Sequence, residues 1–512
     1  MGRTTYVLAH DLGTSADKAT LFTIGGAFVD TVTTPYPTYV LPNGGVEQDP
    51  EDMWGAFCRS TKAILTRVGI DPARIAVVGF DGTFPGCLCL DKDGRPLGRS
   101  LIWQDARAAQ ESAELEERLG KEWLSRFTNP RLGTDKTICK LLWLSRHDPE
   151  RIRRTWKVLP SSQDFVVWRL VGGEPATERL SASSTRLVGR EHGDWSEEAC
   201  GLVGVGLGQM PRMVGRTEVV GTVLPGLAEE TGLVAGTPVV HGTGDSFSAD
   251  VGAGMLEEGD AYLTGGTSGG IYSLARGADG ALRRIGGEAS ASGASMSWLK
   301  NVICVSEQGE STKQARDVFD LIDEEAAQAP IGCHGTMFHP YLSGERWPRF
   351  DPKAQGSFTG ISQNTTRPDL LRAVIEGIGL NMANILDILS EQVRRPSAMP
   401  MVGGLAKGPF VRQTFADILD VELLVPRNPA EMATIGTAVL ASIGIGAYED
   451  EAAGFACFSD FSGTTVPDPE AVEAYRAIRP VYDEVYQAMR PVYPLICDVR
   501  ARLSALEQEP RP

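Results

Sequence analysis

The sequence predicts an α/β protein built from two duplicated domains, and three observations carry this prediction. The chain has 512 residues, which at about 150 residues per domain is enough for two large domains. Short apolar runs typical of strands alternate with amphipathic runs typical of helices. A strand followed by a Gly-Thr-Ser turn occurs at residues 6–15 and again at residues 260–268. We place the boundary at 253/254, which gives domains 1–253 and 254–512.

The first domain is expected to open with a strand at 6–10, a turn at 11–15 and a returning strand at 19–22. The apolar residues of 50–68 share one side of a helix, which predicts an amphipathic helix there. The other elements expected in this domain are strands at 75–80 and 87–90, mainly helices from about 105 to 170, a strand at 237–241 and a short helix at 246–254.

The second domain repeats this opening, with a strand at 260–264 and a glycine-rich turn at 265–269. Further along, Pro409 suits the first turn of a helix. The remaining elements expected are a helix at 368–392, a strand at 400–402, a turn at 403–404, a helix at 409–419, a strand at 423–426, a helix at 431–443 and a helical tail at 467–506.

The composition excludes several classes of protein. With 42% hydrophobic and 22% charged residues the chain is neither disordered nor fibrous. The net charge of -17 disfavours nucleic acid and anionic membranes as partners. Nine scattered cysteines without a CxxC pair predict reduced, buried thiols and a cytoplasmic protein. We expect neither a signal peptide nor a membrane-spanning helix, because no apolar run approaches about 18 residues.

The turn after the first strand has the residues of a phosphate-binding loop. A glycine lets the backbone approach a phosphate, and backbone N–H groups with the hydroxyls of Thr14 and Ser15 can surround its oxygens. Lys18 would add positive charge, and Asp11 at the strand end could hold Mg²⁺. Taken alone, the segment is equally well explained as a Gly/Ser hairpin. The turn at 265–269 repeats the pattern, and two such turns favour the phosphate interpretation.

Asp245 follows a predicted strand within Gly-Thr-Gly-Asp-Ser and precedes a predicted helix. A helix N-terminus stabilises an ionised carboxylate, and an ionised Asp can accept the proton of an attacking hydroxyl. The alternative for Asp245 is an N-cap that satisfies backbone N–H groups.

The segment Gly403–Pro409 joins a strand, a double glycine and a helix start. Such a turn suits a flat base that lies against the backbone. In isolation, a simple strand-to-helix connection explains it as well.

The order of these motifs, over nearly the full chain, resembles the FGGY carbohydrate kinases of the sugar kinase, Hsp70 and actin superfamily. Residues 356–361 with 369–376 fit the C-terminal signature of that family. Residues 137–147 fit the N-terminal signature, although Asp135 departs from the small or aromatic residue usual at its start. The segment 102–107 is typical of the family, and 340–346 is most similar to xylulokinases.

The resemblance implies two ribonuclease H-like, actin-like ATPase domains with an active-site cleft between them, and ATP and Mg²⁺ as cofactors. It implies Asp245 as the general base and Asp11 as the residue that organises Mg²⁺. Leu405 stands where relatives usually carry a third glycine. The nucleotide-binding residues implied are Thr14, Ser15, Lys18, Gly266, Thr267, Gly404, Leu405 and Gly408.

The segment Gly79–Gly86 occupies the substrate-contact loop of the family. Xylulokinases typically carry Gln-Met-His where this chain carries Thr83, Phe84 and Pro85, and glycerol kinases carry Arg-Glu at the last two positions. Ser246 stands where an Asn often follows the base.

Several residues are expected on the sugar side of the site. Trp103 is equally compatible with a core position, and Asp81 and Thr83 with turn positions. The substrate-binding residues expected are Asp81, Thr83, Phe84, Trp103, Asp105 and Asp245.

We therefore expect ATP-dependent phosphorylation of a sugar hydroxyl, with a ketopentose such as D-xylulose as the leading substrate. A kinase for another ketose or polyol, of the ribulose, erythritol or glycerol type, is the alternative within the family. A non-catalytic sugar- and ATP-binding regulator, or an actin-like ATPase, is the alternative of another class; the presence of both Asp11 and Asp245 argues against it. The expected partners are a small-molecule sugar or polyol and, since dimers are common in the family, a second copy of the chain.

Overall fold

The computed structural model describes residues 4–124, 132–189, 193–277, 280–314 and 316–508. By its contacts the chain divides into two compact units, unit 1 (Met1–Gly252 and Glu431–Ser459) and unit 2 (Ala253–Ala430 and Asp460–Pro512). The sequence suggested a single boundary at 253/254. The structure differs because the helix that begins at Met432 packs on the sheet of unit 1, so the chain returns there after residue 430.

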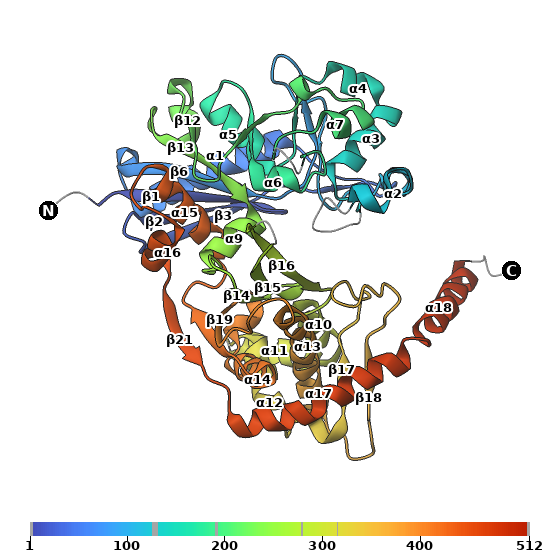
Figure 1. The fold of residues 1–512 in the computed structure, drawn as a ribbon. Coiled ribbons are helices and arrows are strands. Elements are labelled where there is room, and N and C mark those ends of the chain that lie inside the picture. The colour runs from blue at the N-terminus through green and yellow to red at the C-terminus, as the bar shows by residue number, and fades with distance from the viewer. Residues whose placement is uncertain (1–3, 125–131, 190–192, 278–279, 315, 509–512) are drawn as a thin grey trace. The chain divides into compact units, whose positions relative to one another are not determined.

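The sheet of unit 1 has the strand order β12-β13-β6-β1-β2-β3 (Figure 1). β1, β2 and β3 form an antiparallel meander, β6 and β13 run parallel to β1, and β12 is antiparallel to β13. The carboxyl ends of β1, β6 and β13 therefore lie at one edge of the sheet. The bounds are β1 (Tyr6–Leu12), β2 (Ala16–Thr23), β3 (Phe28–Pro35), β6 (Ile75–Gly82), β12 (Val219–Thr222) and β13 (Pro238–Gly244).

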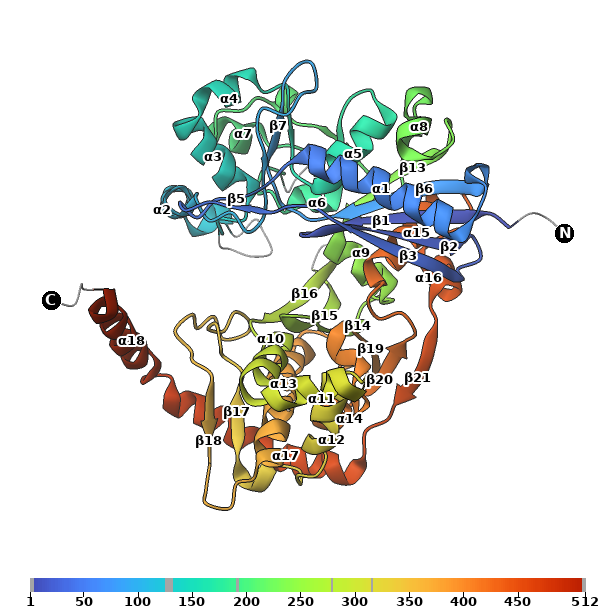
Figure 2. The same ribbon diagram turned by 180° about the vertical axis from the view of Figure 1, so that it is seen from behind.

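Helices cover both faces of this sheet (Figures 1 and 2). α1 (Pro50–Val68) and α5 (Ser162–Val171) lie on one face, and α9 (Asp245–Gly252) and α15 (Met432–Gly444) lie on the other. α9 and α15 pack closely, since a Cβ on Gly436 would lie 1.8 Å from the carbonyl oxygen of Ser248. The start of α9 is thereby fixed by a segment almost 200 residues later in the chain.

A second core of unit 1 forms around the helices between residues 109 and 210. Seven of the nine cysteines are buried, Cys87 and Cys89 among them. The other elements of unit 1 are β4 (Tyr39–Val40), β5 (Val46–Gln48), β7 (Leu88–Leu90), β8 (Ser100–Leu101), β9 (Lys157–Leu159), β10 (Ala176–Glu178), β11 (Arg212–Val214), α2 (Ala109–Leu124), α3 (Thr137–His147), α4 (Pro149–Arg154), α6 (Arg179–Ser183), α7 (Glu197–Leu202), α8 (Ala228–Thr231) and α16 (Glu451–Phe458).

The sheet of unit 2 repeats the topology of unit 1. Its order is β16-β15-β14-β19-β20-β21, with an antiparallel meander β14-β15-β16, two parallel neighbours and an antiparallel edge strand. Two sheets of the same topology support the duplication inferred from the two Gly-Thr-Ser turns. The bounds are β14 (Ala261–Gly265), β15 (Gly269–Arg276), β16 (Leu282–Ala289), β19 (Ala398–Val402), β20 (Glu422–Pro426) and β21 (Phe461–Thr465).

α13 (Arg367–Ser390) crosses the core of unit 2. In the described part of the chain it is the one helix long and apolar enough to span a membrane, but 78% of its most apolar window is buried, as in the core helix of a globular unit. The other elements of unit 2 are α10 (Gly293–Trp298), α11 (Val305–Gln314), α12 (Val318–Ala326), α14 (Pro409–Leu419), α17 (Pro469–Met489), α18 (Tyr493–Gln508), β17 (Met337–His339) and β18 (Ser357–Thr359).

Candidate active site

The turn between β1 and β2 is held by bonds to its carbonyl groups. The Thr14 carbonyl accepts from Thr38 Oγ1 at 3.1 Å and the Ser15 carbonyl from the Tyr36 N–H at 3.1 Å. The Tyr36 hydroxyl donates to the carbonyl of Gly13. Within the turn the Gly13 N–H donates to the carbonyl of Ala16 at 3.0 Å, whereas the N–H groups of Thr14 and Ser15 take no part in these bonds. N–H groups that a turn does not use can bind an anion.

Lys18 lies directly opposite Asp11 in the β1–β2 ladder. Its Nζ is 3.7 Å from Oε2 of Glu431, which also accepts from Thr20 Oγ1 at 3.1 Å. Glu431 precedes α15, so the returning segment orients the lysine at the turn. No sequence pattern signals this role of Glu431, because it depends on a contact across more than 400 residues.

Asp11 and Asp81 form a pair of carboxyl groups at the edge where the parallel strands end. They are opposite each other in the β1–β6 register. Burial raises the pKa of Asp11, although the charge of Lys18 opposes the shift. Burial and the charge of Asp11 raise the pKa of Asp81 well above its usual value, so the protonated form of Asp81 is favoured. Thr437 on α15 donates to Oδ2 of Asp81.

Asp245 lies at the same edge, one residue beyond the end of β13. Thr243 pairs with Asp81 in the β13–β6 register, and the charge of Asp245 is one of those that raise the pKa of Asp81. The strand end is fixed by hydrogen bonds from Thr243 Oγ1 to Glu178 (2.7 Å) and from the Gly244 N–H to Ser181 Oγ (2.8 Å). Asp245 Oδ1 accepts a hydrogen bond from the N–H of Ser246 at 2.6 Å, so the carboxylate contacts the backbone at the start of α9.

Phe84 forms an aromatic wall beside Asp245. Its ring stacks on Phe247 with centroids 5.0 Å apart. The ring also covers Gly244, where a Cβ would lie 2.0 Å from Phe84 Cε1. Thr83 is buried, and its N–H donates to the carbonyl of Leu12 at 3.1 Å. Neither Phe84 nor Phe247 offers a hydrogen bond to a ligand, so this side of Asp245 is apolar.

Trp103 lies beside the first turn and is partly exposed, whereas Asp105 is buried in an ion pair. Trp103 is 38% exposed and donates from Nε1 to Thr14 Oγ1 at 3.2 Å, which places it beside the turn and not in the core. Asp105 is buried in an ion pair with Arg107 at 2.7 Å and accepts from the N–H of Val46 at 2.9 Å. Both oxygens of Asp105 are therefore engaged by protein donors.

The second glycine turn, in unit 2, is held in the same manner as the first. The carbonyl of Gly266 accepts from the N–H of Gly293 at 2.9 Å, and that of Thr267 from the N–H of Ala294 at 2.9 Å. The N–H groups of Gly266 and Thr267 again take no part in these bonds.

The turn after β19 packs against this second turn. Gly403 has φ +87°, and a Cβ there would lie 2.8 Å from the backbone of Gly265. Leu405, in the short 3₁₀ helix η6 (Gly404–Lys407), covers Gly265 from the other side. A side chain at either glycine would push the two turns apart.

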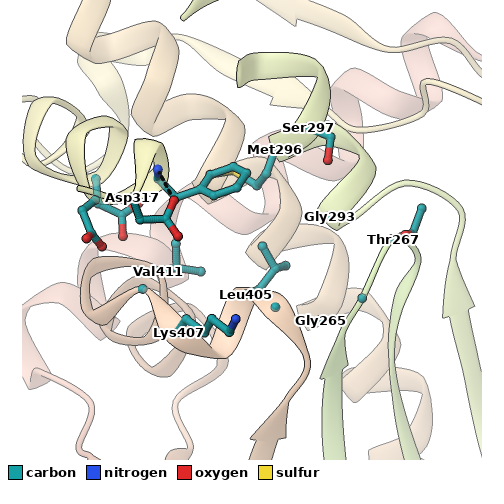
Figure 3. Close-up of a pocket in the computed structure, with 15 residues that line it drawn as sticks. Gly265, Thr267, Gly293, Met296, Ser297, Asp317, Leu405, Lys407 and Val411 are labelled. Atoms are coloured by element: carbon teal, nitrogen blue, oxygen red, sulfur yellow. Dashed lines mark hydrogen bonds between the residues drawn. The ribbon is translucent and has the colours of Figure 1, made fainter. Parts of the chain in front are cut away.

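A cavity of about 400 Å³ opens between the two turns and α12. Figure 3 shows Thr267 at one side and Asp317 at the other, with Leu405 between them. The five residues of this unit predicted to bind nucleotide are brought together here. The lining residues are Gly265, Gly266, Thr267, Gly293, Met296, Ser297, Asp317, Phe319, Asp320, Asp323, Gly404, Leu405, Lys407, Gly408 and Val411.

Sequence reasoning missed the contribution of α12 to this cavity. Asp317, Asp320 and Asp323 recur every three residues, which places them near one side of the helix. The spacing is a readable signal, but it also fits an ordinary solvated helix face.

The comparison with known proteins decides the family. Residues 6–252 match the N-terminal domain of the FGGY family of carbohydrate kinases, and residues 275–445 match its C-terminal domain. The chain belongs to the FGGY family of carbohydrate kinases. It is therefore an ATP-dependent sugar kinase, and the family predicted from the sequence is confirmed.

This carbohydrate kinase is 31% identical over 443 residues to the xylulose kinase of Escherichia coli K12, covering 85% of the chain and 89% of the relative. It is 26% identical over 496 residues to the gluconokinase of Bacillus subtilis, covering 94% and 95%. The crystal structure of ligand-bound xylulose kinase from Lactobacillus acidophilus matches with a TM-score of 0.85 at 24% identity, covering 96% and 100%. This likeness confirms the two-domain, actin-like α/β fold.

Proposed function

We propose that this kinase transfers the terminal phosphoryl group of ATP to a hydroxyl of a ketose, with a ketopentose such as D-xylulose as the leading substrate. The observation that carries the proposal is the meeting of Asp11, Asp81 and Asp245 at the carboxyl ends of three parallel strands. Negative groups at one sheet edge beside a phosphate-type turn suit Mg²⁺-assisted phosphoryl transfer.

Asp245 is the proposed general base. It accepts the proton of the sugar hydroxyl as the oxygen–phosphorus bond forms and ADP leaves. A positioned base contributes about 10²–10⁴-fold to the rate. The N–H groups and hydroxyls of Thr14 and Ser15, with Lys18, are proposed to hold the transferring phosphate. In unit 2 the turn of Gly266 and Thr267 is proposed to hold phosphate as well, and Gly404, Leu405 and Gly408 to hold the adenine side.

Asp11 is the proposed Mg²⁺ residue. Its Oδ1 is buried and accepts no hydrogen bond from the described residues. An oxygen ligand of this kind fits Mg²⁺, which when bound would neutralise phosphate charge. Water and phosphate oxygens are proposed to complete the coordination of Mg²⁺ at Asp11.

The substrate side of the proposal rests on Asp81, Thr83, Phe84, Trp103 and Asp245. The xylulose kinases and the gluconokinases among the relatives support a sugar or sugar acid. The stacked rings of Phe84 and Phe247 favour a substrate with an apolar edge near the reacting hydroxyl. Other ketoses and polyols also have such an edge, so they remain the alternative substrates. Asp105, held by Arg107, is proposed to shape the loop beside Trp103.

The test is ADP release from MgATP over a panel of ketopentoses, tetritols, glycerol and D-gluconate. Asp245→Asn should abolish turnover on the best substrate while ADP still binds. Asp30→Asn, a carboxylate of the same unit in an exposed ion pair with Arg67, is the matched control and should leave turnover unchanged. Equal turnover without any sugar would favour an ATPase, and ATP binding with no turnover at all would favour a regulator.

A further inference from the structure

Asp323 is a buried carboxyl group in the cavity of unit 2, and no described residue donates a hydrogen bond to it. The residue is 6% exposed and lines the cavity. Neither Oδ1 nor Oδ2 accepts a hydrogen bond from the part of the chain that the structure describes. Burying a carboxyl group without a donor is unfavourable. A bound molecule with hydrogen-bond donors would remove that cost.

The positive charge of Arg412 lowers the pKa of Asp323, but the Arg412 side chain forms its hydrogen bonds with other groups. Arg412 on α14 donates from Nη1 to the carbonyl of Ala406 at 2.7 Å and to that of Lys407 at 3.0 Å. These bonds fix η6, where the adenine side is proposed to lie. The guanidinium therefore supports the turn of the cavity, and both Asp323 oxygens remain available to a ligand.

The position of Asp323 fits the edge of a nucleotide base. A Cβ on Gly408 would lie 2.5 Å from Asp323 Oδ2, so the carboxyl group abuts the turn that is proposed to hold adenine. Phe319, one helical turn earlier, lines the same cavity with Val411 and Leu405. Apolar walls with one polar group at the edge are what an aromatic heterocycle requires.

We propose that Asp323 selects the purine base by pairing with its Watson–Crick edge. This inference rests on the proposed function of the cavity as the nucleotide site. A protonated carboxyl group donates to adenine N1 and accepts from the adenine N6 amino group. An ionised carboxylate only accepts, so it matches the N1–H and N2 amino groups of guanine. The protonation state of one side chain thus sets the preference between ATP and GTP.

The surroundings of Asp323 place its titration near neutrality. Burial, with the charges of Asp320 and Asp317 on the same helix, raises the pKa of Asp323 to about 7, and Arg412 on α14 opposes the rise. α11 and α13 also pack on α12, but none of their described charged groups is among those that shift the pKa of Asp323. The preference for adenine should therefore weaken as the pH rises through about 7.

The test measures the dissociation constants of ADP and GDP for the full chain by calorimetry, from about pH 6 to about pH 8. Because titration of the nucleotide phosphates affects both ligands alike, the readout is the GDP/ADP ratio of these constants. In the wild type we expect that ratio to fall by about tenfold over this range, the worth of one or two hydrogen bonds.

Two variants separate the proposal from a structural role. Asp323→Asn keeps one donor and one acceptor at every pH, so its GDP/ADP ratio should not move with pH. Asp323→Leu keeps the volume but cannot pair, so its GDP/ADP ratio should be near one and flat. The control Asp320→Asn changes an exposed carboxylate of the same cavity; it should keep the preference for ADP at low pH and shift the transition to lower pH.

The outcomes are distinct. An unchanged ratio in Asp323→Leu would overturn the proposal, as would a wild-type ratio that does not move with pH. Loss of affinity for ADP but not for 2′-deoxy-ADP in Asp323→Leu would overturn it in favour of a contact with the ribose. If the wild type binds no nucleotide at all, the proposed function fails first, which the ADP titration alone reveals.

Discussion

Asp11 and Asp81 lie opposite each other on the parallel strands β1 and β6, and Thr437 donates to Oδ2 of Asp81. Neither strand alone brings two carboxyl groups together, since the pairing arises only when the register of the parallel ladder is set. The pair has a measurable effect on stability, because two buried carboxyl groups this close cannot both ionise without cost.

We expect Asp81→Asn to change how stability depends on pH. The pKa of Asp81 is raised in the folded state, so the folded chain binds more protons than the unfolded chain above the ordinary Asp pKa of 3.8. The free energy of unfolding of the wild type therefore falls as the pH rises through that window. Thermal unfolding with EDTA should show the variant close to the wild type at low pH and more stable at pH 8. Parallel curves for the two proteins would contradict a raised pKa of Asp81 in the folded chain.

We expect Gly244→Ala to destabilise unit 1 and to slow phosphoryl transfer. A Cβ at Gly244 would lie 2.0 Å from the Phe84 ring, so the ring or the strand end before Asp245 must move. Overpacking of this kind costs about 1–3 kcal/mol. Urea unfolding measures the loss, and Phe84→Ala in the same chain should recover most of it. Gly215→Ala, which meets nothing within 4 Å, is the matched control. Equal losses in the presence and absence of the Phe84 ring would rule out this contact as the cause.

We expect His339 to make unit 2 sensitive to acid. Its Nε2–H donates to the carbonyl of Tyr482 at 3.0 Å, its ring stacks on Tyr482, and burial lowers its pKa to about 4. The unfolded chain then binds more protons than the folded chain between about pH 4 and the ordinary His value of 6.5. The contribution of His339 to the free energy of unfolding is therefore fully present above pH 6.5 and is lost as the pH falls toward about 4. The full loss for this group is about 3 kcal/mol. The difference in stability between wild type and His339→Phe should shrink from pH 7 to pH 5; a constant difference would contradict the buried neutral imidazole.

We expect residues 1–252 alone to fold poorly. The face of the sheet that α15 covers would be exposed, and Asp81 and Lys18 would lose Thr437 and Glu431. A chain that joins residues 1–252 to residues 431–459 by a flexible linker should unfold cooperatively, as judged by calorimetry. Cooperative unfolding of 1–252 without the added segment would show that α15 is dispensable.

The sequence predicted those parts of the fold and the site that depend on local pattern. The helices expected at 50–68 and 409–419 have these bounds in the structure, and both Gly-Thr-Ser turns join antiparallel strands. Asp81, which the sequence allowed as a turn residue, lies inside β6, because the ladder with β1 continues to Gly82.

Long-range pairing explains what the sequence did not predict. The sequence predicts a helix at 431–443 within the second domain, but the helix, Met432–Gly444 in the structure, belongs to unit 1. Its apolar surface does not say which sheet it covers. The roles of Glu431 and Thr437 follow from that packing. The burial of Asp323 depends on α12 lying against η6 and α14, which no local spacing encodes.

The return of residues 431–459 to unit 1 has a consequence for the growing chain. During synthesis the sheet of unit 1 emerges about 180 residues before the helix that closes it, a delay of roughly 9–36 s at about 5–20 residues per second. Through that interval the nascent chain carries an uncovered apolar sheet face and an incomplete acidic edge. The part of the protein that is made first therefore cannot reach its final form until residue 459 has been made, and it is during this interval that a chaperone holding the nascent chain would matter most.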